Sequence, residues 1–145
     1  MNKIGSMLIV LTLATPLIGP IPSAAESALA IGSTGNVVKD GIAMGDGYNA
    51  PTREVAIAKA LAECGAFNAP KARPYCQIVG TFTGQCDAIA LDPKPGTPGV
   101  GWAIAATKEV AESQALANCQ VTAGPSRRQF CAAQFSHCDT ATQPK

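Results

Sequence analysis

The stretch REVAIAKALAEC at residues 53–64 recurs 55 positions later as KEVAESQALANC at residues 108–119. In both copies the final cysteine is followed by another cysteine twelve residues later, at Cys76 and at Cys131. Agreement in residue type, order and spacing on this scale indicates an internal duplication, in which each copy forms one structural unit.

Each copy also contains segments that are typical of β-strands. The runs ALAI at 28–31 and AIAL at 88–91 are short and apolar, and a turn rich in glycine or proline follows each of them. Apolar runs bounded by turn residues predict strands. The expected strands are 28–31, 41–49 and 76–83 in the first copy, and 88–91, 99–105 and 131–136 in the second.

The repeated motif itself predicts a helix in each copy, from 53 to 64 and from 108 to 119. A threonine directly precedes each helix and can cap its first turn with a hydroxyl oxygen. Glu54 and Glu109 fall in the first turn, where a carboxylate interacts favourably with the helix dipole. We therefore expect these two glutamates to stabilise the helices rather than to act in catalysis.

One face of each expected helix carries small side chains. They are Ala56, Ala60 and Cys64 in the first copy, and Ala111, Ala115 and Cys119 in the second. A stripe of small residues lets a helix lie close against a sheet. The sequence therefore predicts an α+β fold: a duplicated ββαβ unit, an antiparallel sheet with two short helices, and three disulfides. A mostly helical fold is the alternative.

Residues 1–25 have the order of a secretory signal peptide. Lys3 gives a positive start, an apolar run follows at 7–14, and SAA at 23–25 places small residues where a signal peptidase cuts. The apolar run is too short to cross a bilayer, which takes about 20 residues. We expect cleavage after Ala25, with a cut after Ala30 as the alternative, and no membrane span once the leader is removed.

The remaining chain is expected to form one disulfide-stapled domain at 26–139, with copies at about 28–87 and 88–139 and a flexible tail at 140–145. The formal charge of +1 falls to zero when Lys3 leaves with the signal peptide. Nucleic acids and anionic membranes attract proteins through a concentrated positive field, so we expect neither as a partner. The sequence indicates no particular oligomeric state.

All six cysteines lie beyond the expected leader. An even number of cysteines behind a signal peptide indicates disulfides, because exported proteins reach an oxidising compartment. A cysteine-based zinc site is disfavoured, since the chain has no Cys-x-x-Cys motif and only one histidine. We expect a periplasmic or secreted protein with no metal and no cofactor.

The spacing of the cysteines also suggests how they pair. The expected bridges are Cys64–Cys76, Cys119–Cys131 and Cys86–Cys138. The first two follow from the constant twelve-residue interval, and each would join a helix end to the next strand. The third would then pair across the two copies and hold the halves together. Six cysteines allow 15 connectivities, and the main alternative joins Cys64 directly to Cys119.

The order of these motifs resembles a bacterial secreted family known as domain of unknown function 4189. The shared features are TREVA and ALAEC within 52–64, TKEVA and ALANC within 107–119, AIA at 88–90, and the pairs Gly47-Tyr48 and Gly101-Trp102. The first strand departs slightly, reading ALA at 28–30. The resemblance spans about Ala28 to Cys138. It implies export and disulfides, and it brings no catalytic residue, cofactor or substrate.

Candidate chemistry centres on one histidine and two aspartates. His137 directly precedes Cys138 and is either a general base near Asp87 or Asp139, or a residue of a surface turn. The two aspartates each follow the third cysteine of a copy, so they are expected to be symmetry mates. Two carboxylates about 5–10 Å apart can hydrolyse a glycosidic bond. Capping of a turn is the alternative role for each aspartate.

Tyr48 and Trp102 occupy similar places just before the helices, and they either anchor a ligand or pack at the strand ends. The nearby glycines lack the Gly-Lys-Ser/Thr pattern of a phosphate-binding loop. We expect a non-enzymatic domain that binds another envelope or secreted protein, as an inhibitor or accessory module. The alternatives are a cell-wall or glycan hydrolase using Asp87 and Asp139, and thiol redox chemistry at a labile disulfide.

Overall fold

The computed structural model describes residues 25–139. All but the last residue of the expected signal peptide, and the expected tail at 140–145, lie outside the described residues. The elements are, in order, β1 (Glu26–Gly32), α1 (Val37–Asp40), β2 (Ala43–Ala50), α2 (Arg53–Ala66), η1 (Arg73–Tyr75), β3 (Cys76–Phe82), β4 (Cys86–Leu91), β5 (Val100–Ala105), α3 (Lys108–Ala123), η2 (Arg128–Phe130) and β6 (Ala132–Cys138).

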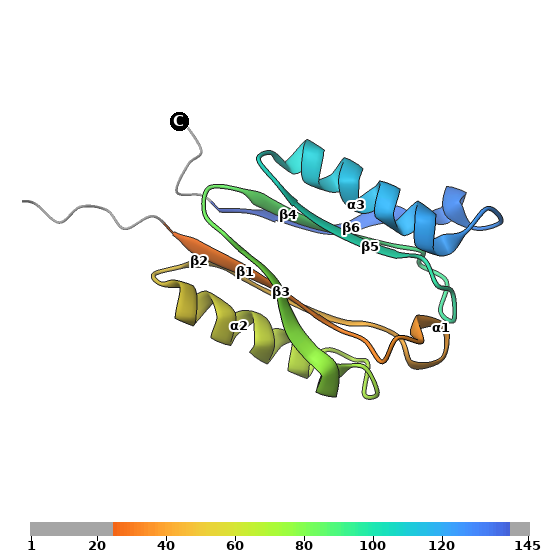
Figure 1. Ribbon diagram of the computed structural model, residues 1–145, viewed down its shortest axis with the longest axis horizontal. Coiled ribbons are helices and arrows are strands. Elements are labelled where there is room, and N and C mark those ends of the chain that lie inside the picture. The colour runs from red at the N-terminus through yellow and green to blue at the C-terminus, as the bar shows by residue number, and fades with distance from the viewer. Residues whose placement is uncertain (1–24, 140–145) are drawn as a thin grey trace, which may run out of the picture.

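The elements form four layers, in which two antiparallel sheets face each other and a long helix covers the outer side of each sheet (Figure 1). The strand order is β2-β1-β3 in the first sheet and β5-β4-β6 in the second. The α+β class and the duplicated unit are confirmed. The strands divide into two sheets rather than one, because the first strand of each copy lies between the other two strands of its own copy.

Small residues fill the layers between helix and sheet, and larger residues fill the layer between the sheets. Successive side chains of a strand point to opposite faces. In β1, Ala28 and Ala30 therefore pack with the α2 alanines, whereas Leu29 and Ile31 belong to the core between the sheets. The corresponding alanines of the second copy pack against α3. The alanine stripes recognised in the sequence are thus the surfaces by which the helices contact the sheets.

Glycines of β2 and β5 allow the helices to approach the strands closely, as Gly45 and Gly101 illustrate. A β-carbon on Gly45 of β2 would lie 2.2 Å from the backbone nitrogen of Cys64 in α2. A β-carbon on Gly101 of β5 would lie 2.2 Å from the carbonyl oxygen of Ala115 in α3. No side chain fits at such distances, so glycine at these two positions sets the spacing between sheet and helix.

Both long helices begin where the sequence predicts. The hydroxyl oxygen of Thr52 accepts a hydrogen bond from the backbone N–H of Val55 at 3.3 Å, and Thr107 caps α3 in the same way. Both helices continue past the cysteine at which the sequence predicts their end, to Ala66 and Ala123. The short helix α1 was not expected; the side chain of its N-cap residue, Asn36, accepts a hydrogen bond within the turn.

The three disulfides join the pairs that the spacing suggests: Cys64–Cys76, Cys119–Cys131 and Cys86–Cys138. The first two connect the end of α2 to the start of β3 and α3 to the residue before β6, with 6.0 Å between Cα atoms in each case. The expected role of the third is wrong. Cys86 begins β4 and lies opposite Cys138 of the neighbouring strand β6, so this bridge lies within the second sheet. The first copy already ends with β3 at Phe82, which leaves Cys86 in the second copy.

Asp92, which follows β4, is anchored by Arg127 from the segment after α3. The guanidinium Nε and Nη2 donate to the two carboxylate oxygens at 2.5 and 2.8 Å, and the aspartate side chain is buried. These hydrogen bonds from Arg127 lower the pKa of Asp92 to about 2. The pair therefore ties the loop after β4 to the end of the α3 segment.

A lowered pKa gives this pair a defined pH dependence. Its stabilising effect is complete above the ordinary aspartate pKa of about 4 and is lost as the pH falls through about 2. We expect the free energy of unfolding to fall between pH 4 and pH 2 in the wild type. Asp92→Asn should be less stable at pH 7 and should show a shallower fall. Urea unfolding at several pH values measures both, with Glu109→Gln as a control that loses only the helix-dipole contribution of one exposed carboxylate and keeps most of the fall. A steep fall retained in Asp92→Asn would contradict the assignment.

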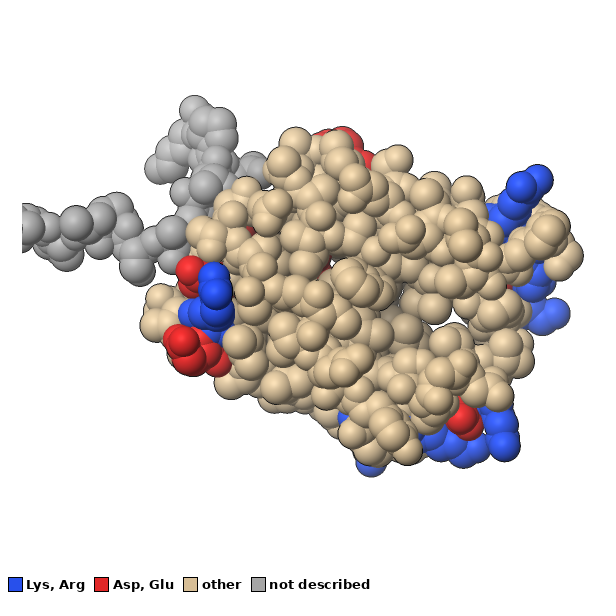
Figure 2. Space-filling model, viewed as in Figure 1, with Lys and Arg blue, Asp and Glu red and all other residues tan. Residues whose placement is uncertain are grey.

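The charged side chains on the face shown in Figure 2 lie mostly at its ends, and the centre of that face is uncharged. Among residues 25–139, no helix has the length and apolar character needed to cross a membrane.

Candidate functional site

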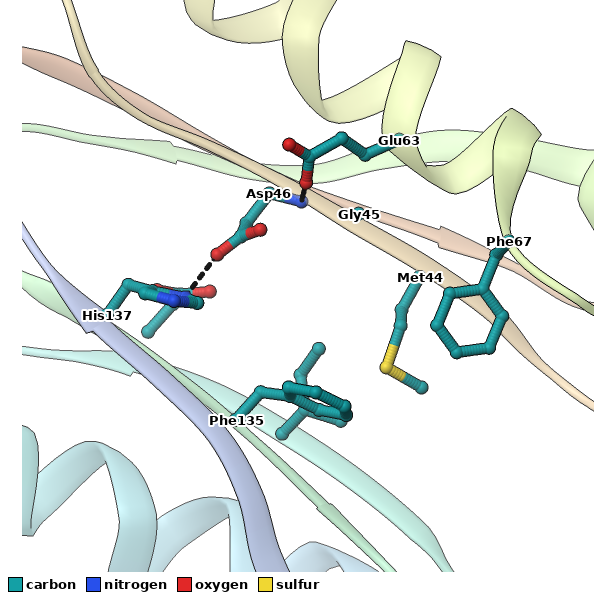
Figure 3. A pocket seen from close by; sticks show the side chains of 9 residues that line it. Met44, Gly45, Asp46, Glu63, Phe67, Phe135 and His137 are labelled. Atoms are coloured by element: carbon teal, nitrogen blue, oxygen red, sulfur yellow. Dashed lines mark hydrogen bonds and ion pairs between the residues drawn. The ribbon is translucent and has the colours of Figure 1, made fainter.

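A pocket of about 170 Å³ opens between the two sheets (Figure 3). Its lining comes from β2, α2 with the residue that follows it, β4 and β6. The lining residues are Met44, Gly45, Asp46, Glu63, Phe67, Asp87, Ile89, Phe135 and His137. Both copies of the duplicated unit therefore contribute to one site.

The strand register places the polar residues of this pocket. Met44 and Asp46 are two residues apart in β2 and share a face, and the same holds for Phe135 and His137 in β6. Asp87 lies directly opposite His137 across the β4–β6 pair. The polar side chains thus reach the same space from both sheets, each beside an apolar neighbour on its own strand.

Asp46, Asp87 and His137 form the polar end of the pocket. One carboxylate or imidazole atom of each residue lies within 4.8 Å of the corresponding atoms of the other two. The Asp46 carboxylate contacts His137 Nδ1 directly, as the dashed line in Figure 3 shows. The His137 ring stacks on Tyr48, with ring centroids 4.6 Å apart and planes 6° from parallel. The stacking holds the orientation of the imidazole plane.

Asp87 is the most deeply placed of the three. The residue is 2 % exposed, and within residues 25–139 its Oδ1 atom has no hydrogen-bond partner. Burial raises the pKa of Asp87 to about 6; the nearby charge of Asp46 adds to this effect and His137 opposes it. A buried carboxylate oxygen without a hydrogen-bond partner carries a free-energy cost that a bound donor or cation would remove.

Glu63 of α2 supports the polar end from the helix side. Its Oε2 accepts a hydrogen bond from the backbone N–H of Asp46 at 3.3 Å (Figure 3). Burial raises the pKa of Glu63, and the Asp46 carboxylate adds to the rise. The glutamate fixes β2 at the residue that carries the first carboxylate.

The opposite side of the pocket is apolar. Met44, Phe67, Ile89 and Phe135 provide its surface, and Phe135 is 47 % exposed. Figure 3 shows the labelled apolar side chains gathered on one side and the carboxylates with the imidazole on the other. The pocket therefore suits a ligand with both an electropositive or hydrogen-bonding group and an apolar part.

The duplication supplies an internal comparison for the polar residues. Leu29 pairs with Asp46 in the first sheet, and the equivalent Ile89 pairs with Trp102 in the second. Trp102 is therefore the counterpart of Asp46. By the same reasoning the pair Ser27 and Phe82 corresponds to Asp87 and His137. Because the fold accepts Trp102, Ser27 and Phe82 at the equivalent positions, it does not require the polar trio for its own packing.

The structure brings together only some of the residues that the sequence singles out. Asp87 lines the pocket. Asp139 does not; it is buried, and its Oδ2 accepts a hydrogen bond from the backbone N–H of Gly84 at 3.3 Å. The backbone N–H of Asp139 donates to the Gln85 carbonyl, so this aspartate anchors the turn between β3 and β4. Asp139 therefore lies outside the pocket lining to which Asp87 belongs.

The two aromatic candidates also separate. Tyr48 supports the polar end of the pocket through His137, whereas Trp102 lines a different hollow together with residues of β1 and the β1–β2 connection. Their similar places in the sequence do not correspond in the fold. Gly45, rather than Gly47, is the register equivalent of Gly101, which shifts the two aromatics out of equivalence.

Asp46, Glu63 and Phe135 were not identified from the sequence, and His137 was given only as one of two alternatives. His137 lies in β6 rather than in a turn, and its counterpart in the first copy is Phe82. A position-by-position comparison of the two copies contains the missing signal, since Asp46 and His137 replace residues that are aromatic in the other copy. The correct alignment requires the strand register.

Comparisons with curated proteins and with solved structures found no match. A family model described as Domain of unknown function (DUF4189) matches residues 27–138, which include every strand of the fold except the first residue of β1. The chain belongs to this family.

Proposed function

We propose that this protein is a non-enzymatic binding module of the cell envelope and that a protein partner inserts a group into the pocket between the sheets. The buried Oδ1 of Asp87, which has no partner among residues 25–139, is the observation that carries the proposal. It is an acceptor that the fold leaves unsatisfied, in a pocket with an apolar side and an opening to solvent. A ligand that donates to this oxygen would remove the cost of burying it.

The chemistry of the lining favours binding over covalent catalysis. Among the described residues, the pocket lining contains no serine, threonine, cysteine or lysine, and all six cysteines are in disulfides. A glycan hydrolase built on Asp87 and Asp139 would need both carboxylates at one site. Asp139 instead accepts a hydrogen bond from the turn at Gly84.

Export is part of the proposal. Three disulfides are typical of proteins that mature in an oxidising compartment. Cleavage after Ala25 would leave β1 complete, whereas cleavage after Ala30 would remove most of β1, the central strand of the first sheet. The first site is therefore the one compatible with the fold.

Site-specific photocrosslinking tests the pocket as the contact surface. In cells that export the protein, the photoreactive residue benzoylphenylalanine replaces Phe135 at the pocket. In a control, it replaces Val121, a residue of α3 that is 81 % exposed. We expect one discrete adduct from position 135 and none from position 121. Adding Asp87→Asn should reduce the adduct at least several-fold, because it removes the charged acceptor, while Glu109→Gln should leave it unchanged.

Two results would overturn this proposal. One is the absence of any specific adduct at position 135. The other is an adduct that forms equally well with Asp87→Asn, which would place the contact outside the polar end of the pocket. Circular dichroism and a free-thiol count on the purified variants establish that each retains its fold and its three disulfides.

A further inference from the structure

We infer that the polar end of this pocket is a binding site for a divalent transition-metal ion such as Zn²⁺, held by Asp46, Asp87 and His137. The inference rests on the proposed function, because it concerns the same pocket. It identifies the electropositive group that the pocket's carboxylates would bind as a metal ion. The ion would leave at least one coordination position open toward the pocket, where a group of the partner could bind it.

The three residues provide a suitable set of ligand atoms. Imidazole nitrogen and carboxylate oxygen are both ligands of Zn²⁺ in proteins. Their candidate atoms already lie within 4.8 Å of one another. A tetrahedral Zn²⁺ with bonds of about 2.0–2.2 Å holds its ligand atoms roughly 3.3–3.6 Å apart. Small side-chain rotations are therefore enough to bring the three groups around an ion.

The unsatisfied carboxylate of Asp87 is an independent reason to place a ligand here. Asp46 has His137 as a direct partner, but Asp87 Oδ1 has none among residues 25–139, in a residue that is 2 % exposed. A cation bound by the three groups would satisfy this oxygen. It would also remove the repulsion between two neighbouring carboxylates.

Neighbouring residues hold the ligands in place. Tyr48 stacks on His137 and fixes the plane of its ring, and Glu63 fixes β2 through the backbone N–H of Asp46. Such supporting contacts orient the groups that bind a metal. Three protein ligands leave the fourth position of a tetrahedral Zn²⁺ to water or to a group of another molecule, whereas structural zinc sites have four protein ligands. The disulfides already staple this fold, so the ion has no need to serve as a structural crosslink.

The duplication determines the expected stoichiometry. The equivalent place in the other half carries Trp102, Ser27 and Phe82, which offer no comparable set of ligands. The inference therefore requires one ion for each chain.

Calorimetric titration of the untagged, disulfide-intact protein with ZnCl₂, after chelator treatment and its removal, tests the site. We expect one Zn²⁺ per chain and a higher melting temperature in its presence. Asp87→Asn and His137→Phe should each weaken Zn²⁺ binding at least about 10-fold. His137→Phe keeps a ring that can stack on Tyr48 while removing the ligand atom. The control Glu109→Gln removes one negative charge, as Asp87→Asn does, but from an exposed position on α3. Its affinity for Zn²⁺ should lie within about twofold of that of the wild type. Ca²⁺, which prefers oxygen ligands, should bind more weakly than Zn²⁺.

Absence of Zn²⁺ binding to the wild type would overturn the metal site. Zn²⁺ binding by Asp87→Asn and His137→Phe as tight as that of the wild type would overturn it as well, because the ion would then lie elsewhere. If Zn²⁺ does not bind but the adduct at position 135 forms and depends on Asp87, the proposed binding function stands and the group that enters the pocket is not a metal. If Zn²⁺ binds as expected and no adduct forms, the metal site stands without the partner.

Discussion

Replacing Gly101 with alanine is expected to destabilise the protein by about 3 kcal/mol or more. The added β-carbon would lie 2.2 Å from both the Ala115 carbonyl oxygen and the Cys119 backbone nitrogen. Both atoms belong to the backbone of α3, and Cys119 is also tied to Cys131, so the helix would have to move away from the sheet as a whole. Its buried alanine face would lose contact with β4 and β5.

Gly65→Ala is the matched control for this substitution. Gly65 lies in the last turn of α2, and a β-carbon there would meet no atom within 4 Å. Alanine at this position should leave stability unchanged or raise it by up to about 1 kcal/mol, because alanine favours the helix over glycine. Unfolding of both variants in guanidinium measures their free energies of unfolding. Where a variant accumulates too poorly for this, the yield of soluble, disulfide-bonded protein is compared instead. Equal stability of Gly101→Ala and the wild type would show that α3 does not require this close approach.

The second large effect is expected from removing a disulfide. The loss of stability should increase with the length of the loop that the disulfide closes. Removing a bridge releases loop-closure entropy in the unfolded chain, and the effect grows slowly with loop length. Cys119–Cys131 has a sequence separation of 12, which corresponds to about 3 kcal/mol. Cys86–Cys138 has a separation of 52, which corresponds to about 4 kcal/mol.

Double alanine variants of each pair, unfolded by denaturant under non-reducing conditions, measure this order. We expect the Cys86→Ala, Cys138→Ala variant to fold and to be the less stable of the two. It should still fold because the first sheet forms without an equivalent bridge: Ser27 pairs with Phe82 where Asp87 pairs with His137, and Glu26 stands where Cys86 stands. A smaller loss for this variant than for the short-loop variant would show that the chain-entropy account does not describe this protein.

Local sequence signals are sufficient for the strands and the two long helices of this fold, although not for the short helix α1. Thr52 and Thr107 mark the starts of the helices, the alanine stripes mark their buried faces, and short apolar runs mark the central strands. The division into two sheets is not local information, because an apolar run such as ALAI does not specify which strands will lie on either side of it. The role of the Cys86–Cys138 bridge could not be predicted for the same reason. Whether the bridge joins the two copies or lies within one sheet depends on which strands pair.

The site could be predicted less well than the fold. Asp46 lies between two glycines, and nothing around it in the sequence suggests a functional carboxylate. Its place in the site arises from the packing of the two sheets, which brings β2 close to β4 and β6 of the other copy. Asp139, in contrast, has a clear sequence position after a cysteine, but its carboxylate serves the turn at Gly84. Proximity to a conspicuous motif was therefore a weaker guide than position on a strand face.

The face-to-face stacking of the two copies also bears on how such a pocket can arise. If the two copies were separate, identical chains in a symmetric dimer, one gene would encode both. Any substitution would then appear at both ends of the interface. Within one covalent chain, codon 46 and codon 102 mutate independently. One end can keep its aromatic packing, with Trp102 and Phe82 in the core between the sheets, while the other acquires charge. Carrying both copies in one chain therefore lets one end of the interface keep its packing role while the other end holds Asp46, Asp87 and His137.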